Sequence, residues 1–162
     1  MGKTITIVLV SDNHGFRKPL EYIRMMHSDA DYFFHCGDTE LPPYELDGFA
    51  VVQGNNDYYS QYPLRKVLEI GTHRILLTHG HRDMIFGQYK MLAERAKAFD
   101  CDIVCFGHTH IFHDSEIDGI RILNPGSVWR NRDGTKPSYM VITLDGPDIH
   151  AERKELDLKS MK

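Results

Sequence analysis

The feature that most constrains the fold of this 162-residue chain is a set of short apolar runs that end abruptly in Asp, Asn or His, mostly beside a glycine. The residues that follow five of these runs read SDNHG at 11–15, HCGD at 35–38, GNND at 54–57, THGH at 78–81 and GHTH at 107–110. Short continuous apolar runs are typical of strands that are buried on both faces. The carboxyl ends of such strands meet at one edge of an α/β sheet, so the five polar clusters are expected to share one location.

The order of the apolar patterns predicts a mixed α/β domain. Strands are predicted at 4–10, 32–34, 49–52, 67–70, 74–77 and 102–106, and helices from Pro19 onward and over 88–99. In the first helix Leu20, Ile23 and His27 share one face, which is the spacing of an amphipathic helix. The first half of the chain therefore alternates strands and helices.

Turn residues predict hairpins in the rest of the chain. The turns are Gly71-Thr72, Asp118-Gly119 and Asp145-Gly146, and the last two join strands predicted at 112–117, 120–123, 138–144 and 148–154. The second half is thus expected to be a run of antiparallel strands. Together the two halves predict one domain over residues 1–162, with two packed sheets and helices outside.

Composition limits the classes of function. The chain is 41% hydrophobic and 26% charged with a formal net charge of -4, so it lacks the basic footprint of a nucleic-acid binder. Three Cys without a CxxC pair argue against a disulfide framework and favour reduced thiols in a cytoplasmic protein. The apolar run at the N-terminus is too short for a signal peptide, and no stretch suits a membrane span.

The residue types in the five clusters point to a metal site. Imidazole nitrogen, carboxylate oxygen and amide oxygen suit Mn, Fe, Zn or Ni. Seven donors are too many for one tetrahedral ion, whereas two ions that share a carboxylate would use them well. Two anionic ligands, Asp12 and Asp38, leave a net charge of about +2, which favours a phosphate ester and lowers the pKa of a bridging water. Turn chemistry could explain each motif alone, but it would leave several buried His and Asp without partners.

The ordered set Asp-x-His, Gly-Asp, Gly-Asn, His and Gly-His-x-His resembles the calcineurin-like metallophosphoesterase superfamily. The short length, THGH at 78–81 and NPGS at 124–127 resemble its small bacterial single-domain phosphodiesterase branch. The resemblance runs from Ile5 to about Ser127. It implies a four-layer α/β/β/α sandwich, in which helices flank two mixed β-sheets, and a dinuclear site at the strand ends.

The resemblance also implies a role for each donor. It assigns the first metal to Asp12, His14 and His110, the second metal to Asn55, His79 and His108, and the bridge to Asp38. The cofactors would be two divalent ions, manganese before nickel, iron or zinc. The implied mechanism is attack on phosphorus by a hydroxide that bridges the two ions.

The expected activity is a phosphodiesterase acting on small phosphate esters or nucleotides. One alternative is a phosphomonoesterase or nuclease at the same site. Another is a protein-binding scaffold like the retromer subunit that keeps this fold with a decayed metal site, although no His ligand is lost here. A homo-oligomer is compatible with either reading.

The sequence departs from the wider superfamily at Asn56. Many members have a His there, which can act as general acid or contact the phosphate, whereas Asn cannot protonate a leaving alkoxide. Asp38, His81 and Asn56 are therefore the positions at which a direct catalytic role is weighed, and His81 could either contact phosphate or hydrogen-bond a ligand. Arg17 and Arg130 are further candidates for phosphate contact. Asp57 is expected to orient a ligand or to cap a turn.

Overall fold

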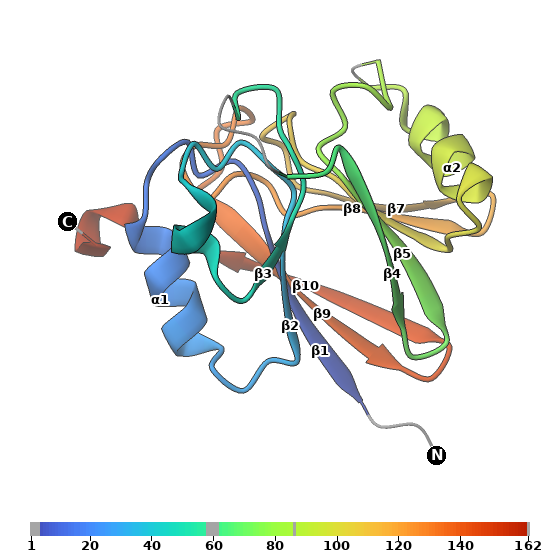
Figure 1. Ribbon diagram of the computed structural model, residues 1–162, viewed down its shortest axis with the longest axis horizontal. Coiled ribbons are helices and arrows are strands. Elements are labelled where there is room, and N and C mark those ends of the chain that lie inside the picture. Colours follow the sequence, from blue (N-terminus) through green and yellow to red (C-terminus); the bar gives the residue numbers. More distant parts are fainter. Residues whose placement is uncertain (1–3, 58–61, 86, 162) are drawn as a thin grey trace.

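Two five-stranded sheets pack face to face in the computed structural model, which describes residues 4–57, 62–85 and 87–161 (Figure 1). The first sheet has the order β10-β9-β1-β2-β3 and consists of β1 (Ile5–Val10), β2 (Tyr32–His35), β3 (Phe49–Val51), β9 (Ser138–Asp145) and β10 (Asp148–Glu155). Strands β1, β2 and β3 are parallel, so their carboxyl ends lie at the same edge. Strand β9 is antiparallel to both β1 and β10.

The second sheet has the order β4-β5-β6-β8-β7. Its strands are β4 (Arg65–Ile70), β5 (His73–Thr78), β6 (Ile103–Cys105), β7 (His113–Ile117) and β8 (Ile120–Asn124). The prediction that the second half is only antiparallel is wrong here, because β8 lies beside β6 and runs parallel to it. After β6 the chain first forms the edge strand β7. It then turns back through a hairpin and forms β8 between β7 and β6. The parallel strands β5, β6 and β8 therefore also end at a common edge.

Helices cover the two outer faces (Figure 1). Helix α1 (Lys18–Met26), with a proline in its first turn, lies against the first sheet, and helix α2 (Tyr89–Ala98) lies against the second. Two short 3₁₀ helices, η1 (Pro43–Leu46) and η2 (Leu158–Met161), complete the described elements. The layers follow the order helix, sheet, sheet, helix, which confirms the predicted α/β/β/α sandwich.

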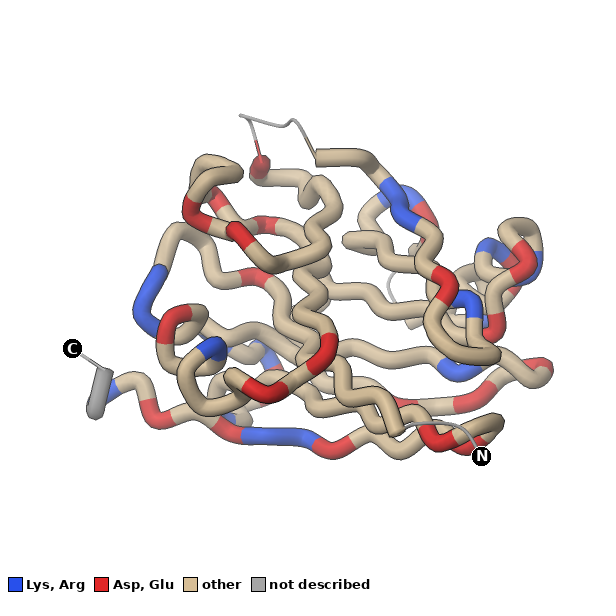
Figure 2. Tube along the Cα trace, turned by 60° about the horizontal axis from the view of Figure 1, so that its bottom comes forward, with Lys and Arg blue, Asp and Glu red and all other residues tan. Residues whose placement is uncertain are grey.

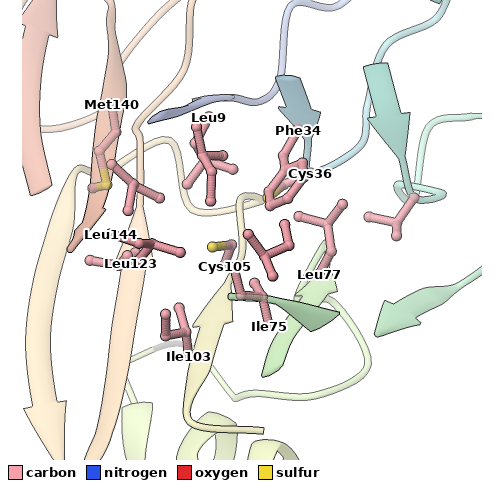
Figure 3. Packing of buried hydrophobic residues seen from close by; sticks show 14 residues of the cluster. Leu9, Phe34, Cys36, Ile75, Leu77, Ile103, Cys105, Leu123, Met140 and Leu144 are labelled. Carbon is pink, nitrogen blue, oxygen red and sulfur yellow. The ribbon is translucent and has the colours of Figure 1, made fainter. Parts of the chain in front are cut away.

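Strand periodicity explains why the apolar runs are continuous. Along β1, Ile7 and Leu9 face the second sheet, while Val8 and Val10 face α1. Figure 3 shows the inner layer, where Leu9 and Phe34 of the first sheet approach Leu77, Cys105 and Leu123 of the second. Because both faces of the parallel strands are buried, polar groups can gather only where the strands end.

The hairpin turns match the sequence except for one shift. Gly71-Thr72 and Asp118-Gly119 connect their strands as predicted. In the third hairpin Asp145 pairs with Asp148, so the turn residues are Gly146 and Pro147 rather than Asp145-Gly146. Proline has no N–H to donate, and Pro147 removes no ladder hydrogen bond because it lies in the turn, outside the paired positions.

Two further expectations concern the surface and the thiols. All three cysteines are free and buried. No helix among the described residues is long and apolar enough to cross a membrane. Figure 2 shows Lys and Arg interspersed with Asp and Glu along the trace, without a broad basic area in this view.

Candidate metal centre

Backbone hydrogen bonds hold the five polar loops together above the strand ends. The N–H of Asp12 donates to the carbonyl of Gly37 at 3.0 Å, which joins the loops after β1 and β2. The N–H of Gly107 donates to the carbonyl of His79 at 3.0 Å, which joins the loops after β6 and β5. The N–H of Val128, which follows β8, donates to the carbonyl of Ser11 and so links the two sheets. The expectation that the polar clusters share one location is confirmed.

Two glycines permit this close approach. A Cβ atom on Gly54 would lie 2.1 Å from Oδ1 of Asp38, and one on Gly107 would lie 2.0 Å from Oγ of Ser11 and 2.6 Å from Oδ2 of Asp12. These separations are far below van der Waals contact. Any larger residue at either position would therefore displace a carboxylate of the candidate site.

The first group of donors surrounds Oδ1 of Asp12. This atom lies 3.4 Å from Nε2 of His110 and 3.8 Å from Nε2 of His14, and the two imidazole nitrogens are 3.1 Å apart. Its sister atom Oδ2 accepts hydrogen bonds from the hydroxyl of Ser11 and the backbone N–H of His108. Oδ1 is buried and has no hydrogen-bond partner in the described part of the chain. The three side chains Asp12, His14 and His110 are close enough to hold one ion.

The second group centres on Asp38 and His79. Nε2 of His79 lies 3.4 Å from Oδ2 of Asp38 and 3.8 Å from Oδ1 of Asp12, and it is buried without a partner among the described residues. Oδ2 of Asp38 also lies 3.8 Å from Nε2 of His14. Asp38 thus stands between a histidine of the first group and His79. Asp12, Asp38 and His79 form a second set that could hold an ion.

The two remaining candidates stand beside this set. Nδ1 of His108 lies 3.1 Å from the side-chain oxygen of Asn55. The ring of His108 is 5.0 Å from that of His79 between centroids. Asn55 is exposed and His108 half-buried, so this pair forms the open side of the centre.

The outer nitrogens of three imidazoles are fixed by groups that only accept hydrogen bonds. Nδ1–H donates to the carboxylate of Glu40 in His14, to the carbonyl of Cys36 in His79 and to the carbonyl of Arg130 in His110, all at 2.7–2.8 Å. Each Nε2 therefore directs its lone pair toward the carboxylates of Asp12 and Asp38. Lone pairs that face one another repel unless a cation lies between them, so this arrangement fits a metal ion.

The charges of the cluster compensate each other strongly. Burial raises the pKa of Asp12, but the nearby His79 and His110 outweigh it and leave the pKa lowered. Burial acts in the same way on Asp38, whose pKa falls well below its usual range because of His79 and Asn56. Burial lowers the pKa of His79, yet Asp12 and Asp38 raise it to about 9. A divalent cation would supply the same compensation as that proton.

The backbone is strained where the candidate ligands lie. Five of them have a positive φ, which costs a residue other than glycine about 1–3 kcal/mol. They are Asp12 (56°), His14 (47°), Asp38 (58°), His108 (69°) and His110 (58°). Only three other non-glycine residues in the described chain share this conformation. Strain concentrated at one set of polar side chains indicates a functional site.

Two of the residues weighed for catalysis take different positions. Asn56 directs its amide onto Asp38, donating from Nδ2 to Oδ2 at 2.9 Å and from its backbone N–H to Oδ1 at 2.8 Å. His81 lies with its ring 5.3 Å from that of His79, and its buried Nδ1 has no described partner. Burial and the charge of His79 lower the pKa of His81.

Arg17 pairs with Glu45 through two hydrogen bonds of 2.5 and 2.9 Å, at the start of α1, and contacts none of the candidate ligands. Arg130 lies beside the centre, because its carbonyl accepts from His110. Asp57 receives five hydrogen bonds, from the N–H groups of Asp38, Thr39, Glu40 and Gly54 and from the hydroxyl of Thr39. Of the two expected roles, these bonds match the capping of a turn, because four of the five donors are backbone N–H groups of the loops after β2 and β3.

Sequence reasoning missed a buried pair beneath the centre. Nε2 of His35 donates to the side-chain oxygen of Asn13 at 2.8 Å, and Nδ1 accepts from the N–H of Gly37 at 3.0 Å. Asn13 also donates to the carbonyl of Thr39 and so fixes the loop after β1 on the loop after β2. A histidine at the last position of a strand, next to a predicted ligand loop, was the signal that could have found it.

A model of the calcineurin-like phosphoesterase superfamily domain matches residues 5–146, and the chain belongs to this superfamily. The probable metallophosphoesterase YsnB of Bacillus subtilis (strain 168) is 34% identical over 144 residues, which cover 87% of this chain and 85% of that protein. A crystal structure of a conserved uncharacterised protein, a predicted phosphoesterase from Streptococcus pneumoniae TIGR4, is 31% identical with a TM-score of 0.89, over 96% of this chain and 91% of that one.

More distant structures share the fold. Vps29 of Cryptosporidium parvum has 21% identity and a TM-score of 0.76, over 96% of this chain and 100% of that one. A novel archaeal phosphodiesterase has 21% identity and a TM-score of 0.70, over 94% and 100%. At this identity the similarity concerns the fold alone.

Proposed function

We propose that this protein is a phosphodiesterase that uses two divalent metal ions to hydrolyse small phosphate esters or nucleotides. The observation that carries the proposal is a pair of buried atoms that have no hydrogen-bond partner among the described residues, Oδ1 of Asp12 and Nε2 of His79, which lie 3.8 Å apart. Two such acceptors side by side are costly in a folded protein unless a cation lies between them. Membership of the calcineurin-like superfamily supports the same conclusion.

The donor arrangement supports a division of ligands between two ions. The first ion would bind Asp12, His14 and His110, and the second would bind Asn55, His79 and His108. Asp38 would bridge them, since its Oδ2 lies 3.8 Å from Nε2 of His14 and 3.4 Å from Nε2 of His79. When bound, two such ions supply Lewis acidity toward phosphoryl oxygens and a water of lowered pKa. Mixed nitrogen and oxygen donors suit Mn, and also Ni, Fe or Zn.

The chain's own residues would hold this centre in place. Glu40 and the carbonyls of Cys36 and Arg130 fix three imidazoles, and Asn56 fixes both oxygens of Asp38. The ring of His81 lies 6.2 Å from that of His108, which borders the open side, so it could meet a phosphoryl oxygen or a leaving group. The formal net charge of -4 disfavours long nucleic acid as the substrate.

The scaffold alternative rests on Vps29, which shares the fold. Similarity at that level does not separate an enzyme from a binding protein. The presence of all seven donors at the strand ends favours the enzyme.

The experiment combines chelation with metal addition. Protein stripped with EDTA should lose hydrolysis of bis(p-nitrophenyl) phosphate and regain it with Mn²⁺, and a monoester and an oligonucleotide should be cleaved more slowly. Asp38→Asn and His79→Ala should lose most activity while keeping the far-UV circular dichroism of the wild type. His150→Ala, which replaces an exposed histidine on β10, is the matched control and should remain active. Activity that survives chelation, or native protein without bound metal, would refute the proposal.

A further inference from the structure

The single tryptophan of the chain lies beside the candidate metal centre. Trp129 is 42% exposed, and its ring centroid is 5.1 Å from that of His14 and 6.4 Å from that of His110. Exposed apolar side chains are common on protein surfaces, so exposure alone means little. A large aromatic face that borders two polar donors is different, because it offers a stacking surface within reach of a bound phosphate.

The segment that carries Trp129 is fixed on the centre. The hydroxyl of Ser127 donates to the carbonyl of Asp12 at 2.7 Å and accepts the N–H groups of Trp129 and Arg130 at 3.0 and 2.9 Å. The N–H of Arg132 donates to the carbonyl of His110 at 2.9 Å. The indole therefore has a defined position relative to Asp12 and His110.

A hollow of about 510 Å³ opens beside this indole. Its lining residues are His110, Trp129, Arg130, Asn131, Arg132 and Gly134. The volume is in the range of sites that hold small organic ligands. Because His110 belongs to both the hollow and the candidate centre, a molecule with its phosphate at the centre could extend into this space.

The two arginines of the hollow have no acidic partner among the described residues. Within the described chain, neither the guanidinium of Arg130 nor that of Arg132 has a side-chain hydrogen bond or ion pair, whereas Arg17, Arg65 and Arg121 are paired with carboxylates. The loop's own carboxylate, Asp133, is bonded to the N–H and hydroxyl of Thr135. Free guanidinium groups match the geometry of phosphate oxygens.

We propose that the hollow is a subsite for a nucleotide-like substrate, with an aromatic base stacked on Trp129 and a second phosphate bound by Arg130 and Arg132. The inference rests on the proposed phosphoesterase function, since that function places the scissile phosphate at the metal centre. It names a substrate class within the small esters considered above: esters that carry both an aromatic ring and a further phosphate.

The first test uses the fluorescence of Trp129, which needs no turnover. Because the chain has one tryptophan, any change in indole emission reports this side chain. ADP should quench the emission of both metal-free and Mn²⁺-loaded protein, and AMP should do so with weaker affinity. Ribose 5-phosphate, which lacks an aromatic base, should bind at least tenfold more weakly than AMP. Emission that is unchanged by ADP up to millimolar concentration would overturn the inference.

Variants separate the base from the second phosphate. By calorimetry, Trp129→Ala should weaken ADP binding about tenfold and Trp129→Phe should recover part of the loss. Arg130→Gln and Arg132→Gln should reduce the preference for ADP over AMP. Tyr44→Ala, at an 81% exposed aromatic residue of η1, and Lys66→Gln, at an exposed residue of β4, are the matched controls and should bind ADP as the wild type does.

Hydrolysis assays distinguish a failure of the proposed subsite from a failure of the proposed phosphodiesterase activity. If the wild type cleaves diesters with Mn²⁺ but Trp129→Ala lowers kcat/KM equally for a nucleoside diester and a methyl diester, the subsite is refuted and the phosphodiesterase stands. If no diester is cleaved but ADP quenches the indole and the variants respond as stated, the proposed activity fails and the nucleotide subsite stands. The expected result is a larger loss on the nucleoside diester.

Discussion

Asn56 donates a hydrogen bond to each carboxylate oxygen of Asp38, from its side-chain amide to Oδ2 at 2.9 Å and from its backbone N–H to Oδ1 at 2.8 Å. This contact gives the loop after β3 control of the carboxylate that follows β2. Asn56 therefore acts on the candidate centre through Asp38 and is a positioning residue.

Replacing Asn56 with Ala should weaken metal binding about tenfold or more, because a hydrogen bond to a charged group contributes roughly 1.5–3 kcal/mol. Titration of the metal against a competing chelator measures this. Gln88→Ala removes an amide at the start of α2 that makes no capping bond, and it should leave metal affinity unchanged. Equal affinity in Asn56→Ala and wild type would show that Asp38 needs no such support.

Asn56→His tests the missing general acid. If a proton donor at this position limits the rate, the variant should hydrolyse esters with poor leaving groups faster than Asn56→Ala does, while p-nitrophenyl esters respond less. The measurement is the ratio of the two rates in each variant. A ratio that is the same in both variants would show that the lack of a proton donor at position 56 does not limit the rate.

Asp57→Asn should destabilise the fold by about 2–4 kcal/mol. The two carboxylate oxygens of Asp57 accept five hydrogen bonds, and an amide NH₂ group would face N–H donors that it cannot accept. Urea unfolding measures the change. Asp148→Asn replaces an exposed carboxylate on β10 and serves as the control, with little expected change.

Gly54→Ala should reduce both stability and metal affinity, since its Cβ would overlap Oδ1 of Asp38 at 2.1 Å. Gly119→Ala, in the β7–β8 turn, meets nothing within 4 Å, and its φ of 81° should cost about 1–2 kcal/mol. Thermal unfolding with and without Mn²⁺ distinguishes the two. A Gly54→Ala protein with wild-type metal affinity would contradict the close packing described for this loop.

Stability should depend on pH through His35, which is buried and is hydrogen-bonded to Asn13 and Gly37. Burial lowers the pKa of His35 from 6.5 to about 4, so between these values the unfolded chain binds the proton more strongly. The stability present above pH 6.5 is therefore lost as the pH falls through 6.5 toward 4, by up to about 3 kcal/mol. Urea unfolding from pH 7 to pH 4.5 should show a steeper loss in the wild type than in His35→Gln.

Much of the fold followed from local patterns. The apolar runs predicted the strands because parallel strands covered on both faces need continuous apolar sequence, as Ile7 and Val8 illustrate on opposite faces of β1. Glycine in the turns predicted the hairpins, and only the register of Asp145 with Asp148 moved one turn by a residue. Local patterns did not predict that β8 lies beside β6. The β7–β8 hairpin is the same whichever of its two strands pairs with β6.

For the site, the polar clusters predicted which loops meet but not how their side chains are shared. Nothing local to Arg17 indicates that Glu45 pairs with it, 28 residues along the chain. The bond from Asn13 to His35 likewise depends on the packing of β1 beside β2. Such contacts arise from tertiary structure, whereas the residue types at the strand ends are visible in the sequence itself.

The left-handed backbone at Asp12, His14, Asp38, His108 and His110 sets a conflict between stability and activity. At such positions glycine relieves strain, so a substitution that removes a ligand can make the metal-free chain more stable. A selection for thermostability alone would therefore erode the centre, starting with the half-buried His14, and would leave the sandwich intact. Loss of the candidate ligands and survival of the fold are separable outcomes for this architecture.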